Sequence, residues 1–161
     1  MPIRKKPWNR VNAPVYSLCT KGENGFNMNI CTYVSPVSMH PKRYMIGVYR
    51  GTQTLKNVYA SDVMVLQILS AEQFRLVNQL GKMSGRHIDK LARLAKRDLL
   101  SEWKDFPVLR DSLALIRIRK KTQINGGDHV CFLFDVLDYC NLHEGRVLDL
   151  DILKENRIIR S

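Results

Sequence analysis

Side chains that could hold a phosphate and a flat polar ring are concentrated between residues 27 and 90. Hydroxyls hydrogen-bond phosphate oxygens, cationic side chains offset the phosphate charge, and amide side chains bond the polar edge of a ring. The polar candidates in this stretch are Asn29, Thr32, Ser35, Thr52, Thr54, Ser84, Arg86 and Lys90. These residue types favour a site for a phosphorylated ring compound, and no Ser-His-Asp, Cys-His or paired-carboxylate pattern can be argued from the sequence.

Length and composition predict one domain over residues 1–161. This length fits the usual range of about 100–200 residues per domain and allows a sizeable core. Prolines at 2, 7 and 14 predict an extended arm over residues 1–14, anchored by Trp8, and residues 146–161 form a C-terminal tail. Because the chain has no run of about eighteen apolar residues and its start is charged, we expect no membrane span and a cytoplasmic protein.

The formal charge of +11 favours acidic partners such as phosphates or nucleic acid. The basic residues are scattered, and no nucleic-acid recognition motif accompanies them. Nucleic acid is therefore the less favoured hypothesis for the binding partner. One row of basic residues at helical spacing, Arg86, Lys90, Arg93 and Arg97, could grip a phosphate, although such rows are usually the solvated side of a helix.

The four cysteines show no pairing at metal-binding spacing. Cys31, Cys131 and Cys140 lie in apolar or aromatic runs, where a reduced cysteine packs as a small hydrophobe. We therefore expect buried free thiols and no structural metal.

The apolar pattern predicts a mainly β chain with a short helical insert. Predicted strands cover residues 15–20, 26–34, 43–49, 63–69, 112–118 and 129–140, and predicted helices cover 55–61, 71–80 and 87–100. Strands joined by turns without βαβ alternation indicate an antiparallel Greek-key barrel, and the absence of a G-x-G-x-x-G run argues against a dinucleotide-binding parallel sheet.

Several local expectations follow from these elements. Strict alternation through residues 26–34 would place Asn29 and Thr32 on opposite sides, and Pro36 would end that strand. Gly81 would end the helix before it. Thr54, just before a predicted helix, could cap that helix or bind a phosphate at its first turn.

Five short motifs occur in a fixed order along the chain: N-I-x-T at 29–32, Pro41, T-x-x-x-V at 54–58, S-G-R-x-x-D-K at 84–90 and G-D-H at 127–129. Together they resemble the FMN-binding split-barrel flavoproteins, in particular their flavin reductase-like and flavoredoxin-like branch. The resemblance covers roughly residues 15–136, most of the chain.

The resemblance implies a Greek-key split β-barrel that forms a homodimer with FMN at or near the subunit interface. It implies an oxidoreductase that passes reducing equivalents from NAD(P)H through the flavin, or alternatively a flavin-binding electron carrier or storage module. The implied cofactor-binding residues are Asn29, Ile30, Cys31, Thr32, Ser35, Thr52, Thr54, Ser84, Arg86, Lys90 and His129. Among them Thr54 and Lys90 match phosphate-end or flavin-contacting positions of the family.

Two positions depart from the pattern of the family. Many relatives carry tryptophan near position 35 and a second proline at 42, where this chain has Ser35 and Lys42. A small residue at 35 would open the space over the flavin. His129 would lie near the ring and could take part in the chemistry, although from the residues alone a capping or core histidine after the Gly-Gly-Asp turn is the plainer reading.

Overall fold

The computed structural model describes residues 4–82 and 89–160. Its main element is a seven-stranded antiparallel sheet with the strand order β2-β1-β5-β8-β9-β4-β3. These strands are β1 (Tyr16–Gly22), β2 (Gly25–Met28), β3 (Val34–Ser38), β4 (Arg43–Tyr49), β5 (Val63–Ile68), β8 (Ala114–Asn125) and β9 (His129–Asn141). A separate hairpin pairs β6 (Leu100–Trp103) with β7 (Phe106–Leu109).

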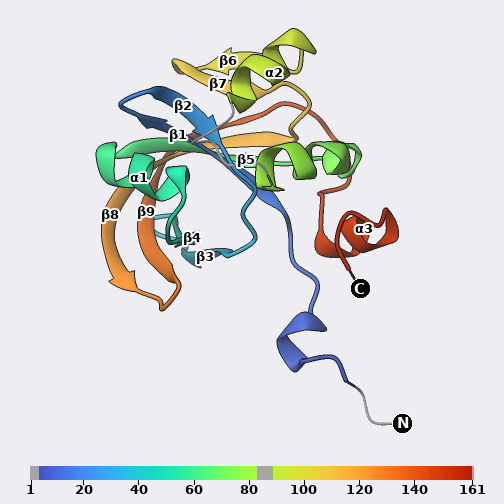
Figure 1. The fold of residues 1–161 in the computed structure, drawn as a ribbon. Helices are drawn as coiled ribbons and strands as arrows, with labels where there is room; N and C mark the ends of the chain where they lie inside the picture. The colour runs from blue at the N-terminus through green and yellow to red at the C-terminus, as the bar shows by residue number, and fades with distance from the viewer. Residues whose placement is uncertain (1–3, 83–88, 161) are drawn as a thin grey trace.

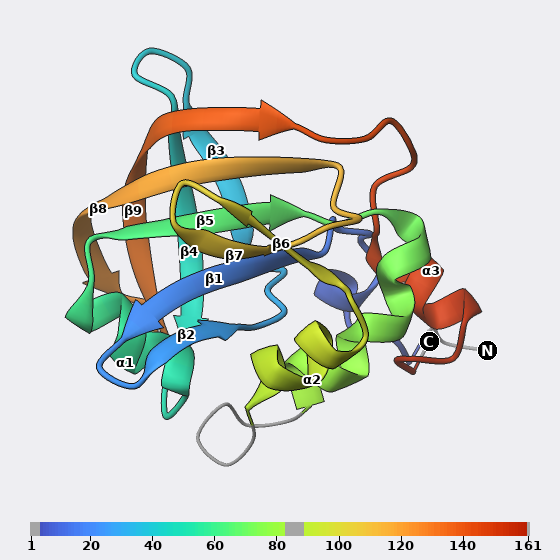
Figure 2. The same ribbon diagram turned by 90° about the horizontal axis from the view of Figure 1, so that it is seen from above.

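The large sheet curls without closing, so β2 and β3 remain its two edges (Figures 1 and 2). This arrangement confirms the predicted mainly β split barrel. The expected strand at 112–118 begins two residues later and runs on to Asn125, paired along its length with β9.

Buried apolar side chains cover both faces of the central strands. On β1, Leu18 and Cys19 belong to two different apolar clusters, and on β5 the same alternation separates Leu66 from Val65. The near-continuous apolar run at 63–69 therefore reflects a strand buried on both sides, as expected. On β4 and β9, in contrast, only one face packs into the core.

The predicted strand at 26–34 is wrong in its middle. β2 ends at Met28, residues 29–33 connect the two sheet edges, and β3 begins at Val34. Within the connection, Cys31 makes an isolated antiparallel bridge to Tyr16. Pro36 lies inside β3 and does not end it, because an edge strand has a side without ladder hydrogen bonds.

Helix α1 (Gln53–Ala60) begins earlier than predicted. Its cap is Thr52, whose hydroxyl accepts a hydrogen bond from the Leu55 amide at 3.2 Å, so the capping role expected at Thr54 is wrong. The helix packs beside the β1–β2 hairpin (Figure 2), where the buried Asn57 side chain donates to Thr20. A Cβ on Gly22 would overlap Asn57, so glycine is required at this contact.

The segment expected as one helix at 71–80 forms two short turns, η2 (Ala71–Leu76) and the π-helical η3 (Asn78–Lys82). A reciprocal pair of hydrogen bonds between Ser70 and Gln73 starts the first. Gly81 lies within the second turn and does not end it. A Cβ on Gly81 would lie 3.4 Å from the side chain of Ile30, so the glycine permits close packing.

Helix α2 (Lys90–Lys96) is shorter than the predicted helix at 87–100. Asp89 caps its first turn, and the chain turns at Asp98, which has a φ of +56°, to enter β6. The predicted start at residues 87 and 88 lies outside the described residues. A last helix, α3 (Leu150–Glu155), is capped by Asp149 within the C-terminal tail.

The N-terminal arm contains one short turn, η1 (Pro7–Asn9), and extends away from the barrel (Figure 1). Trp8 is 71% exposed in the single chain, so its predicted role as an anchor on the same chain is wrong. Within the described residues, no helix has the length and apolar character needed to cross a membrane.

Candidate flavin site

A cleft of about 470 Å³ lies where the sheet fails to close. The β2–β3 connection forms one wall, and the end of β4 with the start of α1 forms another. Its lining consists of Asn27, residues 29–33, 47–49 and 51–54, Leu80, Gly81, Lys90 and His129. Thus segments far apart in the sequence meet at the opening between the two sheet edges.

The β2–β3 connection is held in place by β1. The side-chain oxygen of Asn29 accepts a hydrogen bond from the Leu18 amide at 2.9 Å, which extends the pairing of β1 past the end of β2. Cys31 and Tyr16 exchange two backbone hydrogen bonds of 2.9 Å each. Asn29 and Thr32 both line the cleft, so one ligand could contact both residues even if their side chains point to different sides.

Lys90 provides a cation at one end of the cleft. Its side chain is 5% exposed, and its ammonium donates to the backbone oxygens of Leu80 at 2.6 Å and Met28 at 3.1 Å. Among the described residues, no carboxylate lies within 4 Å of this nitrogen. Burial lowers the pKa of Lys90 to about 8. An ammonium has three donors, and two of the three have partners among the described residues.

The start of α1 provides neutral donors close to the same end. The first amides of a helix have no partner within it, and Thr52 satisfies that of Leu55. The amides of Gln53 and Thr54 have no hydrogen-bond partner in residues 4–82 and 89–160, and both residues line the cleft. The Thr54 hydroxyl is 3.4 Å from the side-chain nitrogen of Asn27, the residue before Met28, so β2 links the start of α1 to Lys90.

His129 lies at the aromatic end of the cleft, between two tyrosines. Its ring centroid is 4.6 Å from that of Tyr33 and 5.1 Å from that of Tyr49. Its Nδ1 lies 2.7 Å from a carboxylate oxygen of Asp128. A carboxylate accepts hydrogen bonds, so Nδ1 is the donor here and Nε2 is left for other partners. His129 therefore neither caps a helix nor lies in a closed core.

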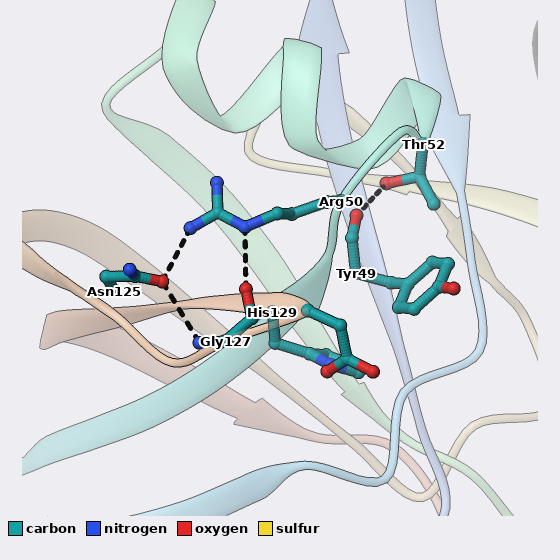
Figure 3. Close-up of polar contacts among 7 residues, drawn as sticks. Tyr49, Arg50, Thr52, Asn125, Gly127 and His129 are labelled. Carbon is teal, nitrogen blue, oxygen red and sulfur yellow. Dashed lines mark hydrogen bonds and ion pairs between the residues drawn. The ribbon is translucent and has the colours of Figure 1, made fainter.

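A network of hydrogen bonds holds the β8–β9 turn that precedes His129 (Figure 3). Arg50 donates to the Gly127 oxygen and to the Asn125 side chain, each at 2.8 Å. Asn125 also accepts from the Gly127 amide at 3.0 Å. The Thr52 hydroxyl donates to the Tyr49 oxygen at 2.8 Å, which ties the cap of α1 to the end of β4. The turn and the helix start are therefore held as one unit.

The cleft brings together eight of the eleven residues predicted to bind a cofactor: Asn29, Ile30, Cys31, Thr32, Thr52, Thr54, Lys90 and His129. Ser35 is not among its lining residues; it borders a neighbouring cavity instead. Ser84 and Arg86 lie outside the described residues. What these side chains bind remains a prediction.

Sequence reasoning missed several lining residues. They are Asn27, Tyr33, Gly47, Val48, Tyr49, Gly51, Gln53, Leu80 and Gly81. The signal that could have found Tyr49 is its position at the end of a predicted strand, directly before a Gly-containing loop.

The predicted free thiols are confirmed, but their burial differs. Cys19 and Cys31 are buried, and burial raises the pKa of each thiol to about 12. Cys31 is therefore a neutral thiol in the cleft wall and not a nucleophile. Cys131 and Cys140 are only half-buried, contrary to expectation. No group of three or more possible metal ligands occurs among the residues that the structure describes.

Comparison with known proteins places the chain in a family. Its residues 8–150 match the family model of the flavin reductase like domain. No curated protein matches the sequence.

Solved structures share the fold at low sequence identity. An NADH:FAD oxidoreductase from Streptomyces globisporus superposes with a TM-score of 0.76 at 16% identity, covering 92% of each chain. An FMN-binding protein from Thermus thermophilus with bound 1-cyclohex-2-enone gives a TM-score of 0.74 at 17% identity, covering 88% of this chain and 76% of the other. A flavin reductase domain protein from Arthrobacter gives a TM-score of 0.73 at 13% identity, covering 86% of this chain and 82% of the other. Since the family model spans most of its length, the chain belongs to the flavin reductase-like domain family.

Proposed function

We propose that this protein binds FMN noncovalently in the cleft and acts as an oxidoreductase that passes reducing equivalents from NAD(P)H through the flavin. The observation that carries the proposal is Lys90, a buried cation without a carboxylate partner among the described residues, at one end of a cleft with an aromatic end. Family membership supports a flavin-related oxidoreductase.

The residues of the cleft fit a flavin mononucleotide. Its volume of about 470 Å³ falls within the usual range for ligand pockets of about 300–1,000 Å³. Lys90 and the free amides at the start of α1 suit a phosphate, because a charged donor and helix amides both favour anions. Tyr33, Tyr49 and His129 offer ring surfaces to a flat heterocycle.

When bound, the flavin supplies the hydride and electron chemistry. The residues of the chain position the flavin. Lys90 holds the phosphate, and the Asn29 to Thr32 wall lies along the cleft where a ring would extend. His129, oriented by Asp128, offers Nε2 to a polar ring atom. The names of the structural relatives include an NADH-dependent flavin oxidoreductase, which supports a nicotinamide nucleotide as the reductant.

We also propose that two copies pair over the outer face of the sheet. On β4 and β9 this face carries Tyr49, which is 56% exposed, and the neighbouring β8 carries Ile124, which is 62% exposed. Tyr33, beside the same face, is 63% exposed. Contiguous exposed apolar side chains of this size mark interaction surfaces. Pairing there would cover the aromatic end of the cleft.

Lys90→Met should weaken FMN binding by about 1.5–3 kcal/mol, or about tenfold to a hundredfold, because it removes a charged hydrogen bond to the phosphate. Riboflavin lacks the phosphate, so its affinity should change little. Fluorescence titration of both ligands measures the two dissociation constants. Lys56→Met, which removes an exposed lysine of α1, is the matched control and should leave both unchanged. Equal losses for FMN and riboflavin would show that Lys90 supports the fold or the ring instead.

Mixing the FMN-loaded protein with NADH or NADPH under anaerobic conditions should bleach the flavin absorbance within seconds in a stopped-flow experiment. Typical turnover numbers of about 1–1,000 per second predict this time scale for an enzyme. If neither nucleotide bleaches the flavin, NAD(P)H turnover is contradicted. The protein would then be an electron carrier or a flavin-storage module. A protein that takes up no FMN at all would refute the flavin proposal itself.

Sedimentation equilibrium should give twice the chain mass of 18.7 kDa. Ile124→Glu should shift the protein toward the monomer, because a charge placed in an apolar interface is left unpaired. Tyr139→Glu, at the other end of β9 and also exposed, is the control and should leave the mass unchanged. A monomeric parent protein would disprove pairing, and an unaffected Ile124→Glu dimer would place it on another face.

A further inference from the structure

Arg50 is the residue at which the chain leaves β4, and it holds the β8–β9 turn with three hydrogen bonds. Its backbone amide donates to the Asp128 oxygen at 2.9 Å, which continues the pairing of β4 with β9 by one residue. Its guanidinium crosses to the same turn (Figure 3), where Nε donates to the Gly127 oxygen and Nη2 donates to the Asn125 side chain. One residue therefore ties the loop that leads to α1 to the turn that precedes His129.

The turn at residues 126–128 has few other contacts that could hold its shape. Gly127 has a φ of +97°, in the region that favours glycine, and all three residues of the turn are exposed. Within the hairpin, the amides of residues 126 and 127 each donate one hydrogen bond. Among the hydrogen bonds within residues 4–82 and 89–160, those that reach the turn from outside the hairpin all come from Arg50. The position of the turn relative to the cleft therefore depends on Arg50.

Asp128 transmits the position of the turn to the ring of His129. Its carboxylate oxygen lies 2.7 Å from Nδ1 of His129, and its side chain is 79% exposed. Because an exposed side chain has little packing of its own, the carboxylate follows the backbone of the turn. The His129 ring is only 19% exposed and lies between Tyr33 and Tyr49. A shift of the turn would therefore displace Nε2 at the aromatic end of the cleft.

Arg50 acts through geometry and not through an ion pair. Its two side-chain acceptors are a peptide oxygen and an amide oxygen, both neutral. Within the part of the chain that the structure describes, no carboxylate lies within 4 Å of its guanidinium. A guanidinium presents its donors in a fixed plane, whereas a lysine ammonium is a point charge on a flexible stem. Because Arg50 and its acceptors are exposed, removing these bonds should disturb the turn without unfolding the barrel.

We propose that Arg50 is a positioning residue for the aromatic end of the cleft, acting through the β8–β9 turn and Asp128 on His129. The loop that begins at Arg50 also leads to the first amides of α1, so the same residue sets the aromatic end relative to the proposed phosphate end. The effect on a bound flavin rests on the proposed function. The effect on the His129 ring is a property of the flavin-free protein and does not depend on it.

NMR spectra of the flavin-free protein test the first step. The two flanking tyrosine rings should displace the ring-proton signals of His129 from those of the exposed His40, and His129→Gln assigns these signals. Arg50→Met should move the His129 signals toward the values of an exposed histidine. Arg119→Met, which removes an exposed arginine of β8, is the matched control and should leave them unchanged.

Asn125 provides the rescue variant. Asn125→Asp keeps an acceptor oxygen for both Arg50 and the Gly127 amide, so it should retain the His129 signals of the parent protein. Asn125→Ala removes the acceptor and should shift the signals in the same direction as Arg50→Met. Parent-like His129 signals in Arg50→Met overturn the inference. A shift with Asn125→Asp as large as that with Asn125→Ala also overturns it.

Flavin titration tests the second step. Arg50→Met should weaken FMN and riboflavin by the same factor, about two- to tenfold, which corresponds to one neutral hydrogen bond at the ring. Lys90→Met, in contrast, should weaken FMN alone. A loss for FMN alone in Arg50→Met, or unchanged affinity for both flavins, overturns the positioning role. If the parent protein binds neither flavin, the proposed function fails, and the spectra of the flavin-free protein still decide whether Arg50 positions His129.

Discussion

The ammonium of Lys90 joins three parts of the chain that the sheet itself does not connect. It hydrogen-bonds the last residue of β2 and the π-helical turn η3, while its backbone begins α2. A buried ammonium is costly unless its donors are satisfied, and here backbone oxygens satisfy two of them without neutralising the charge. The fold thereby keeps a cation at the point where the sheet opens, and the proposed phosphate site depends on that arrangement.

The opening of the sheet has its own cause. β2 is only four residues long, and after Met28 the chain follows side-chain and bridge contacts to β1 instead of pairing with another strand. Asn29 and Thr32, both in this connection, line the cleft. On the outer face of the sheet, acidic residues pair with basic residues of the strands. This pairing offsets part of the large positive charge of the chain. Hydrogen bonds from Arg43 and Arg117 lower the pKa of Asp135 and Asp138, respectively.

The sequence was sufficient to predict the antiparallel barrel, because strand alternation and turn residues are local signals, whereas the eight lining residues that were predicted came from the family resemblance and the other nine were missed. The break after Met28 could not be predicted, since Ile30, Thr32 and Val34 continue the alternating pattern through it. Thr52 and Thr54 are equally good caps by type, and only the hydroxyl geometry selects Thr52. Only the resemblance set Lys90 apart from the row of basic residues at helical spacing. Its burial could not be predicted, because it depends on contacts with β2, which is distant in the sequence, and with the irregular turn η3.

Proton uptake on flavin binding tests the central claim most directly. Burial lowers the pKa of Lys90 to about 8 in the free protein, so Lys90 is partly deprotonated near pH 8, and a bound phosphate would favour its charged form. The flavin phosphate, with a second pKa near 6, has no proton to release there. Calorimetry near pH 8 in buffers of different ionisation enthalpy should therefore show net proton uptake with FMN and none with riboflavin. Equal proton uptake for the two ligands, or none for FMN, would contradict the assignment of Lys90 to the phosphate.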